Sequence, residues 1–106
     1  MTGWKQVATK TVSGVTYTIT ANGQGLAKLS VTCSNVSLAS GASHEATSWI
    51  PSAYLPSTVP GMILTQRSVA NNIIIYFFAT GAVGLNNTYT SAQTATLAHQ
   101  LVYCYI

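Results

Sequence analysis

Apolar and polar positions alternate along most of the chain, which is the pattern of β-strands with one buried face. Every second residue from Val15 to Ile19 is apolar and the residues between are threonines, and alternation resumes from Leu26 to Cys33. Between these runs lies Asn22-Gly23, a dipeptide that favours a tight hairpin turn because both residues tolerate positive φ. The pattern therefore predicts two strands, at 14–21 and 25–34, joined as a β-hairpin.

The middle of the chain lacks a sustained pattern. Residues 34–48 are rich in Ser, Ala, Gly and Asn, and they predict a weak strand at 36–38 followed by a loop. Three prolines follow, at positions 51, 56 and 60. Proline has no N–H to donate to a neighbouring strand, so we expect a long surface loop here.

Strand patterning returns after Gly61. We expect strands at 62–67 and 72–79 around a turn at Asn71-Asn72, after which Thr80-Gly81 leads into a short strand at 82–85. The strand at 72–79 is apolar on both faces. A strand of this kind suits a face buried between subunits.

The last run occupies residues 97–106, after a polar, turn-rich stretch at 86–96. One of its faces carries Leu97, His99, Leu101, Tyr103 and Tyr105. No segment shows a helical period of 3.6 residues over more than two turns. At 106 residues the chain suits a single domain, and the predicted fold is all-β: a small antiparallel β-barrel or sandwich, Greek-key-like in its connections.

Charged side chains are scarce, with four Lys or Arg, a single carboxylate, Glu45, and no Asp. Hydroxyl and amide groups take their place: 11 Ser, 15 Thr, six Asn and five Gln. Paired-carboxylate glycoside hydrolysis, Ser-His-Asp catalysis and carboxylate metal cages all need acidic groups that the chain lacks. We therefore expect no enzyme and no cofactor. A depolymerase would need acids from neighbouring subunits.

Composition also bears on partners. The apolar fraction of 48% is high for so small a chain, which favours burial of apolar surface against another subunit. The cations are scattered and not interleaved with aromatics, so we expect no binding to nucleic acid. No apolar run approaches the roughly 18–20 residues that span a bilayer, so we expect no membrane insertion, and no secretory signal is visible at the N-terminus.

The cysteines and histidines suggest no metal centre. Cys33 and Cys104 end two β-patterned segments, where they could pair, although buried small hydrophobes are the commoner role. Together with His44 and His99 they show no metal-ligand spacing.

Ser48–Ser57, with the sequence SWIPSAYLPS, combines an apolar step, Pro-Ser, an aromatic residue and a second Pro-Ser. An apolar strand and a Gly-centred hairpin follow at 73–85. This arrangement resembles the C-terminal modules of tailed-phage tail fibres, in particular the receptor-binding head domains of phages that infect lactococci and related Gram-positive bacteria. Trp4 opening the first strand and the hydroxyl-rich strand at 14–20 are similar too, so the resemblance extends over most of residues 1–106.

The resemblance implies the head of a homotrimer at the virion's tail tip or baseplate, made in the host cytoplasm. It implies non-catalytic binding of a host cell-surface saccharide or phosphopolysaccharide, and attachment to other tail or baseplate proteins through a preceding N-terminal part. The chain departs from the family in lacking an acidic cluster. A structural trimerisation or tip module without a ligand of its own is the alternative.

Saccharide binding needs a flat aromatic ring and polar groups that hydrogen-bond hydroxyls. Trp49 is a candidate platform, or else a staple that packs its loop, whereas Trp4 is expected in core or stalk packing. Tyr54 lies between two prolines and is expected to pack, with its hydroxyl reaching a ligand. His44 and Glu45 adjoin; in a loop they could converge on sugar hydroxyls, or they form a solvated loop tip.

Four further residues complete the predicted saccharide site. Arg67 offers a planar donor fork, either to a ligand or between subunits. His99 is a satisfied core or interface group, or it borders a site together with the nearby tyrosines. Asn87 and Tyr89, with Asn86, belong to a polar loop near a hairpin tip, where variable ligand contacts are typical.

Overall fold

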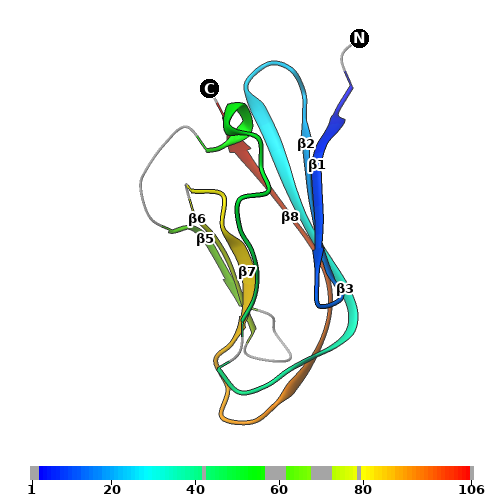
Figure 1. The fold of residues 1–106 in the computed structure, drawn as a ribbon, viewed down its shortest axis with the longest axis vertical. Helices are drawn as coiled ribbons and strands as arrows, with labels where there is room; N and C mark the ends of the chain where they lie inside the picture. Colours follow the sequence, from blue (N-terminus) through cyan, green and yellow to red (C-terminus); the bar gives the residue numbers. More distant parts are fainter. Residues whose placement is uncertain (1–2, 42, 57–61, 68–72, 79, 106) are drawn as a thin grey trace.

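The alternating runs form two antiparallel β-sheets, each with four strands, in the computed structural model of this chain (Figure 1). The structure describes residues 3–41, 43–56, 62–67, 73–78 and 80–105, with the backbone alone at 43, 62–67 and 97. One sheet has the order β1-β2-β3-β8, with β1 Lys5–Val12, β2 Val15–Ala21, β3 Leu26–Leu38 and β8 Gln93–Cys104. The other has the order β4-β7-β6-β5, with β4 Ser43–Ala46, β7 Val83–Asn87, β6 Ile73–Phe78 and β5 Met62–Arg67.

The prediction of an all-β fold is confirmed. Within the described ranges no strand pairing joins one sheet to the other, so the sheets are not closed into a barrel. The helical structure there is a single 3₁₀ turn, η1, at Ser52–Tyr54. No helix in the described part of the chain has the length and apolar character to cross a membrane.

The predicted Asn-Gly hairpin between β2 and β3 is confirmed. The side-chain Oδ1 of Asn22 accepts hydrogen bonds from the backbone N–H groups of Gln24 (2.7 Å) and Leu26 (3.2 Å). Gly23 has a φ of +80°, a conformation that glycine adopts without steric cost. The register that follows pairs Ala21 with Ala27 and places the alternating apolar residues of both strands on one face.

The inner faces of the two sheets form one core. It contains Val15, Tyr17, Ile19, Ala27, Leu29, Val31 and Leu38 from the first sheet and Ile73, Ile75, Phe77, Val83 and Leu85 from the second. Phe77 of β6 meets Tyr103 of β8 edge-on, with ring centroids 5.2 Å apart. This is a favoured aromatic geometry, and it locks the two sheets together. The face predicted for residues 27–33 is buried as expected, with Cys33 half-buried.

The weak strand predicted at 36–38 is confirmed as the end of β3, where Leu38 pairs with Gln93 of β8. The main difference from the prediction lies in the loop expected after it, because the polar segment Ser43–Ala46 forms β4 against β7. β1 also has no clear period of its own, because it is an edge strand whose side chains are mostly exposed. The predicted turn at Asn71-Asn72 lies outside the described residues.

Candidate functional site

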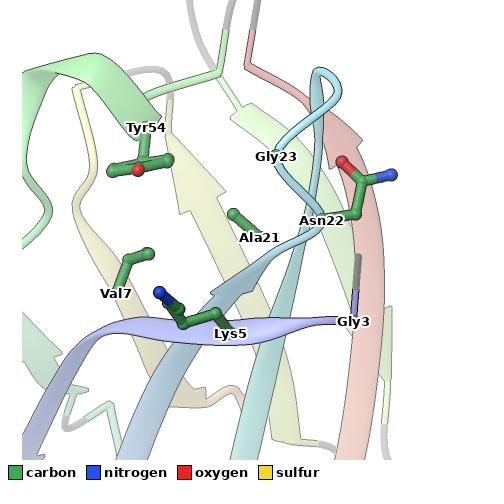
Figure 2. Close-up of a pocket in the computed structure, with 7 residues that line it drawn as sticks. All are labelled: Gly3, Lys5, Val7, Ala21, Asn22, Gly23 and Tyr54. Carbon is green, nitrogen blue, oxygen red and sulfur yellow. The ribbon is translucent and has the colours of Figure 1, made fainter. Parts of the chain in front are cut away.

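An open cleft lies at the end of the molecule that carries the β2–β3 turn (Figure 2). Its volume is about 410 Å³, within the range of sites for small ligands. The lining residues come from the N-terminal segment and β1, from the end of β2 and its turn, and from η1: Gly3, Lys5, Val7, Ala21, Asn22, Gly23 and Tyr54.

Tyr54 forms the aromatic wall of this cleft. η1 places it, because the Tyr54 N–H donates to the carbonyl of Pro51 over 2.9 Å. Two contacts to the end of β8 then hold it: the Tyr103 hydroxyl donates to the Tyr54 carbonyl (2.6 Å), and the Tyr54 and Tyr105 rings lie 5.0 Å apart. The Tyr54 ring stands over Val7 in Figure 2. The wall is therefore a rigid, half-buried ring with one part open to solvent.

Among the described residues of the lining, the one charged group is the ammonium of Lys5, which reaches toward Val7 and the Tyr54 side of the cleft (Figure 2). The described residues of the lining include no carboxylate, histidine or thiol. An aromatic face, an apolar floor and a cationic donor can bind a small ligand. The described lining holds no pair of groups for acid–base or nucleophilic chemistry.

Trp49 was predicted as either a platform or a staple, and its contacts are those of a staple. Its indole Nε1 donates to the carbonyl of Gly81 over 3.0 Å, and its ring packs on Tyr17 at a centroid distance of 6.2 Å. These contacts fix the loop after β4 to the turn between β6 and β7. Trp49 does not line the cleft.

His44 and Glu45 lie in β4 and not in a loop, so they point to opposite faces of the sheet. His44 is opposite the buried Leu85, and its carbonyl accepts a hydrogen bond from the Tyr17 hydroxyl. Glu45 points outward, where its Oε2 accepts from the Tyr76 hydroxyl over 2.8 Å. The two side chains therefore do not form the predicted clamp on one ligand.

Asn87 is fully buried, with 0% of its surface exposed. Its Nδ2 donates to the carbonyls of Leu38 (3.0 Å), Ala39 (3.2 Å) and Ser91 (3.0 Å), and its Oδ1 accepts from the Tyr89 N–H (2.9 Å). The amide thus links the end of β3, at Leu38 and Ala39, to Ser91 in the loop between β7 and β8. It is not available to a ligand in this arrangement. Tyr89 is 47% exposed, and its loop lies at the opposite end of the molecule from the cleft (Figure 1).

The two remaining predicted residues lie apart from the cleft. His99 is half-buried on the inner side of β8, opposite Val31. Arg67 is the last residue of β5, and its backbone pairs with Ile74 of β6. The side chain of Arg67 lies outside the described residues. The structure therefore does not gather into one site the six predicted residues whose side chains it describes.

Of the residues that line the cleft, Tyr54 alone was expected to reach a ligand, and none was among the seven predicted contacts. Sequence reasoning did identify two of the segments that build it, the Asn-Gly turn and the Pro-Ser segment that contains Tyr54. Nothing in the sequence indicates that these segments meet, because residues 22 and 54 are brought together by the packing of η1 on β8.

Neither Cys33 nor Cys104 is in a disulfide. Cys104 is opposite Leu26 at one end of the β3–β8 pair, whereas Cys33 is opposite Leu97 near its middle. Within the described ranges, no group of three or more His, Cys, Asp or Glu residues could hold a metal ion. Comparisons with protein-family models, with curated proteins and with solved structures give no match.

Proposed function

We propose that this domain is a non-catalytic saccharide-recognition module, the receptor-binding head of a phage tail that attaches to host cell-surface saccharides. The observation that carries the proposal is the position of Tyr54. It belongs to Ser48–Ser57, the segment that resembles phage receptor-binding heads, and it forms the aromatic wall of the open cleft.

The chemistry of the cleft supports binding without catalysis. The apolar face of a sugar ring can stack on an aromatic side chain such as Tyr54, and the ammonium of Lys5 can donate hydrogen bonds to ring hydroxyls. Glu45, the one carboxylate side chain of the protomer, is engaged by Tyr76 on the outer face of the other sheet. The described lining of the cleft therefore offers no carboxylate side chain for general acid–base work.

The proposal includes a homotrimer. Ile74, Tyr76 and Phe78 form a half-buried apolar row on the outer face of β6, and the rings of Tyr76 and Phe78 lie 5.3 Å apart. Aromatic side chains of this kind are enriched at subunit interfaces. The sheet order β4-β7-β6-β5, in which β4 lies beside β7, supports the Greek-key-like description.

A tip module without a ligand is the second candidate. It is favoured by the inward-facing contacts of Trp49 and Asn87, which are structural and not ligand-binding. It predicts the same oligomer and an unoccupied cleft.

The test is a titration of the isotopically labelled protein with oligosaccharides released from purified Gram-positive cell wall, followed by amide chemical shifts. We expect shifts at Lys5, Ala21 and Gly23, and a roughly five- to tenfold weaker affinity for Tyr54→Ala. Tyr89→Ala is the matched control, because it removes an exposed tyrosine at the other end of the molecule. Absence of any shift at millimolar saccharide would exclude the saccharide role and leave the tip module.

A further inference from the structure

Exposed apolar side chains gather at one end of the outer face of the β1-β2-β3-β8 sheet. In the described part of the chain, four large hydrophobic residues are exposed: Trp4 (45%), Leu26 (38%), Tyr89 (47%) and Val102 (52%). All but Tyr89 lie close together. Val102 is opposite Lys28 in the β3–β8 register, Leu26 is two residues before Lys28, and the Lys28 ammonium lies 5.2 Å from the centroid of a Trp4 ring. Apolar clusters on a surface commonly mark binding sites.

This patch adjoins the cleft. Trp4 lies between Gly3 and Lys5, both of which line the cleft. Lys5 is the first residue of β1 and is opposite Ala21, which also lines the cleft. Trp4 therefore belongs to a three-residue stretch whose other two members form part of the cleft rim, and Gly3 adds no side chain to that rim.

The two tryptophans differ in what they offer to a ligand. Trp49 is held by Gly81 and Tyr17 as part of the fold. Trp4 keeps almost half of its surface exposed. From the sequence, Trp4 was expected to pack, and Trp49 was left open between a platform and a staple. Of the two, only Trp4 combines an exposed indole with a neighbouring hydrogen-bond donor, the Lys28 ammonium.

A polar atom beside this patch lacks a partner. Thr20 is directly opposite Lys28 in the β2–β3 register, and its Oγ1 is buried without a hydrogen bond. Buried hydroxyls normally find a partner. The Lys28 ammonium, displaced from the indole by a ligand, would satisfy it with one of its three N–H donors and keep the others for the ligand.

We propose that Trp4 and Lys28 form a second saccharide subsite next to the Tyr54 cleft. The ligand is then an oligosaccharide of at least two rings, with one ring in the cleft and the next stacked on the Trp4 indole. Lys28 donates to the hydroxyls of the stacked ring. This inference rests on the proposed saccharide function and names the length of ligand that the site takes.

A saccharide fits this patch better than a protein partner does. Three partly exposed side chains offer far less surface than the roughly 800 Å² per partner of a standard protein interface. One of the four cationic residues, Lys28, lies over the indole and another, Lys5, lines the adjoining cleft, whereas the core of a protein interface is depleted of charge. A hydroxyl-bearing ring that stacks on one side and accepts hydrogen bonds from ammonium groups matches both features.

The experiment measures affinity for the mono-, di- and trisaccharide fractions of hydrolysed Gram-positive cell-wall polysaccharide. We expect the wild type to bind the trisaccharide about tenfold more tightly than the monosaccharide, and Trp4→Ala to lose that gain while monosaccharide affinity is unchanged. Lys28→Met should lose about threefold for the trisaccharide only. It tests the same subsite even if Trp4→Ala does not fold.

Tryptophan fluorescence gives an independent readout. In Trp49→Phe, Trp4 is the remaining tryptophan, and its emission should change with the trisaccharide but not with the monosaccharide. Full trisaccharide affinity in both Trp4→Ala and Lys28→Met would overturn the subsite while the saccharide function stands. A change in oligomeric state with unchanged affinity would make the patch a subunit contact and also overturn the subsite. Lack of binding by the wild type to every fraction would remove both proposals.

Discussion

The Tyr76 hydroxyl donates a hydrogen bond to Oε2 of Glu45 over 2.8 Å, although the two residues lie on β6 and β4 with β7 between them. The bond passes over Gly84, which is opposite both residues in the strand register. A Cβ at position 84 would lie 2.5 Å from the Tyr76 hydroxyl oxygen, closer than side-chain carbons approach. Glycine is therefore needed here for the close approach of the tyrosine, and the chain's one carboxylate side chain is held on the outer face of this sheet as a result.

Gly84→Ala should displace the Tyr76 ring and break its hydrogen bond to Glu45. We expect a loss of about 1–3 kcal/mol in the free energy of unfolding, the usual cost of overpacking. Chemical denaturation measures it. Tyr76→Phe is the control, since it removes the hydrogen bond without a clash and should cost less than about 1 kcal/mol. Equal stability of Gly84→Ala and the wild type would show that the ring moves freely.

Asn87→Ala should destabilise the fold strongly. The substitution leaves the carbonyls of Leu38, Ala39 and Ser91 without the donor that they share, and we expect a loss of about 2–4 kcal/mol on thermal or chemical unfolding. Tyr89→Ala, an exposed neighbour, should change stability by less than about 0.5 kcal/mol. A stable Asn87→Ala protein with impaired saccharide binding would instead assign the amide to a ligand.

Stability should fall at alkaline pH because of two buried tyrosines. Burial raises the pKa of Tyr17 and of Tyr103 well above the ordinary tyrosine value of about 10, and for each a neighbouring tyrosine adds to the shift. The unfolded chain releases these protons near pH 10 and the folded chain does not. The free energy of unfolding is therefore unaffected below about pH 10 and decreases as the pH rises above it.

Absorbance of tyrosinate near 295 nm follows this titration. The component due to Tyr17 and Tyr103 should appear only together with unfolding, as monitored by circular dichroism. Tyr17→Phe and Tyr103→Phe should each reduce that delayed component. Ionisation of both phenols in a protein that is still folded would contradict the burial of their hydroxyls.

Oxidation should not link Cys33 to Cys104 within one chain. Cys33 is opposite Leu97, which lies seven residues before Cys104 along β8. At roughly 3.4 Å per residue this places the two cysteines about 24 Å apart. A disulfide needs Cα atoms within about 7 Å. Mass spectrometry after mild oxidation should find Cys104, the exposed thiol, modified or joined to a second chain. An intrachain Cys33–Cys104 peptide from folded protein would refute the strand register.

The sequence alone determined which residues face the core in the regular strands. Val15, Tyr17 and Ile19 are buried as their alternation with threonine predicted, because a strand points successive side chains to opposite faces. Asn22-Gly23 determined the hairpin, because its turn geometry depends on residues next to each other in the chain.

Tertiary structure decided which partners the irregular segments meet. Ser43–Ala46 has no strand pattern and becomes β4 only because β7 offers it an edge, which turns His44 and Glu45 to opposite faces. Asn87 is buried where its amide donates to three carbonyls, two at the end of β3 and one in the loop before β8.

The two tryptophans show the same limit. Trp4 and Trp49 carry the same side chain, and local sequence does not reveal which finds a carbonyl and a ring to pack against. Trp49 meets Gly81 and Tyr17 through contacts between residues far apart in the chain, whereas Trp4 remains exposed beside the cleft. Alternation along the sequence shows to which face of its own strand a side chain points. Which residues the side chain meets on that face is decided only when the two sheets pack.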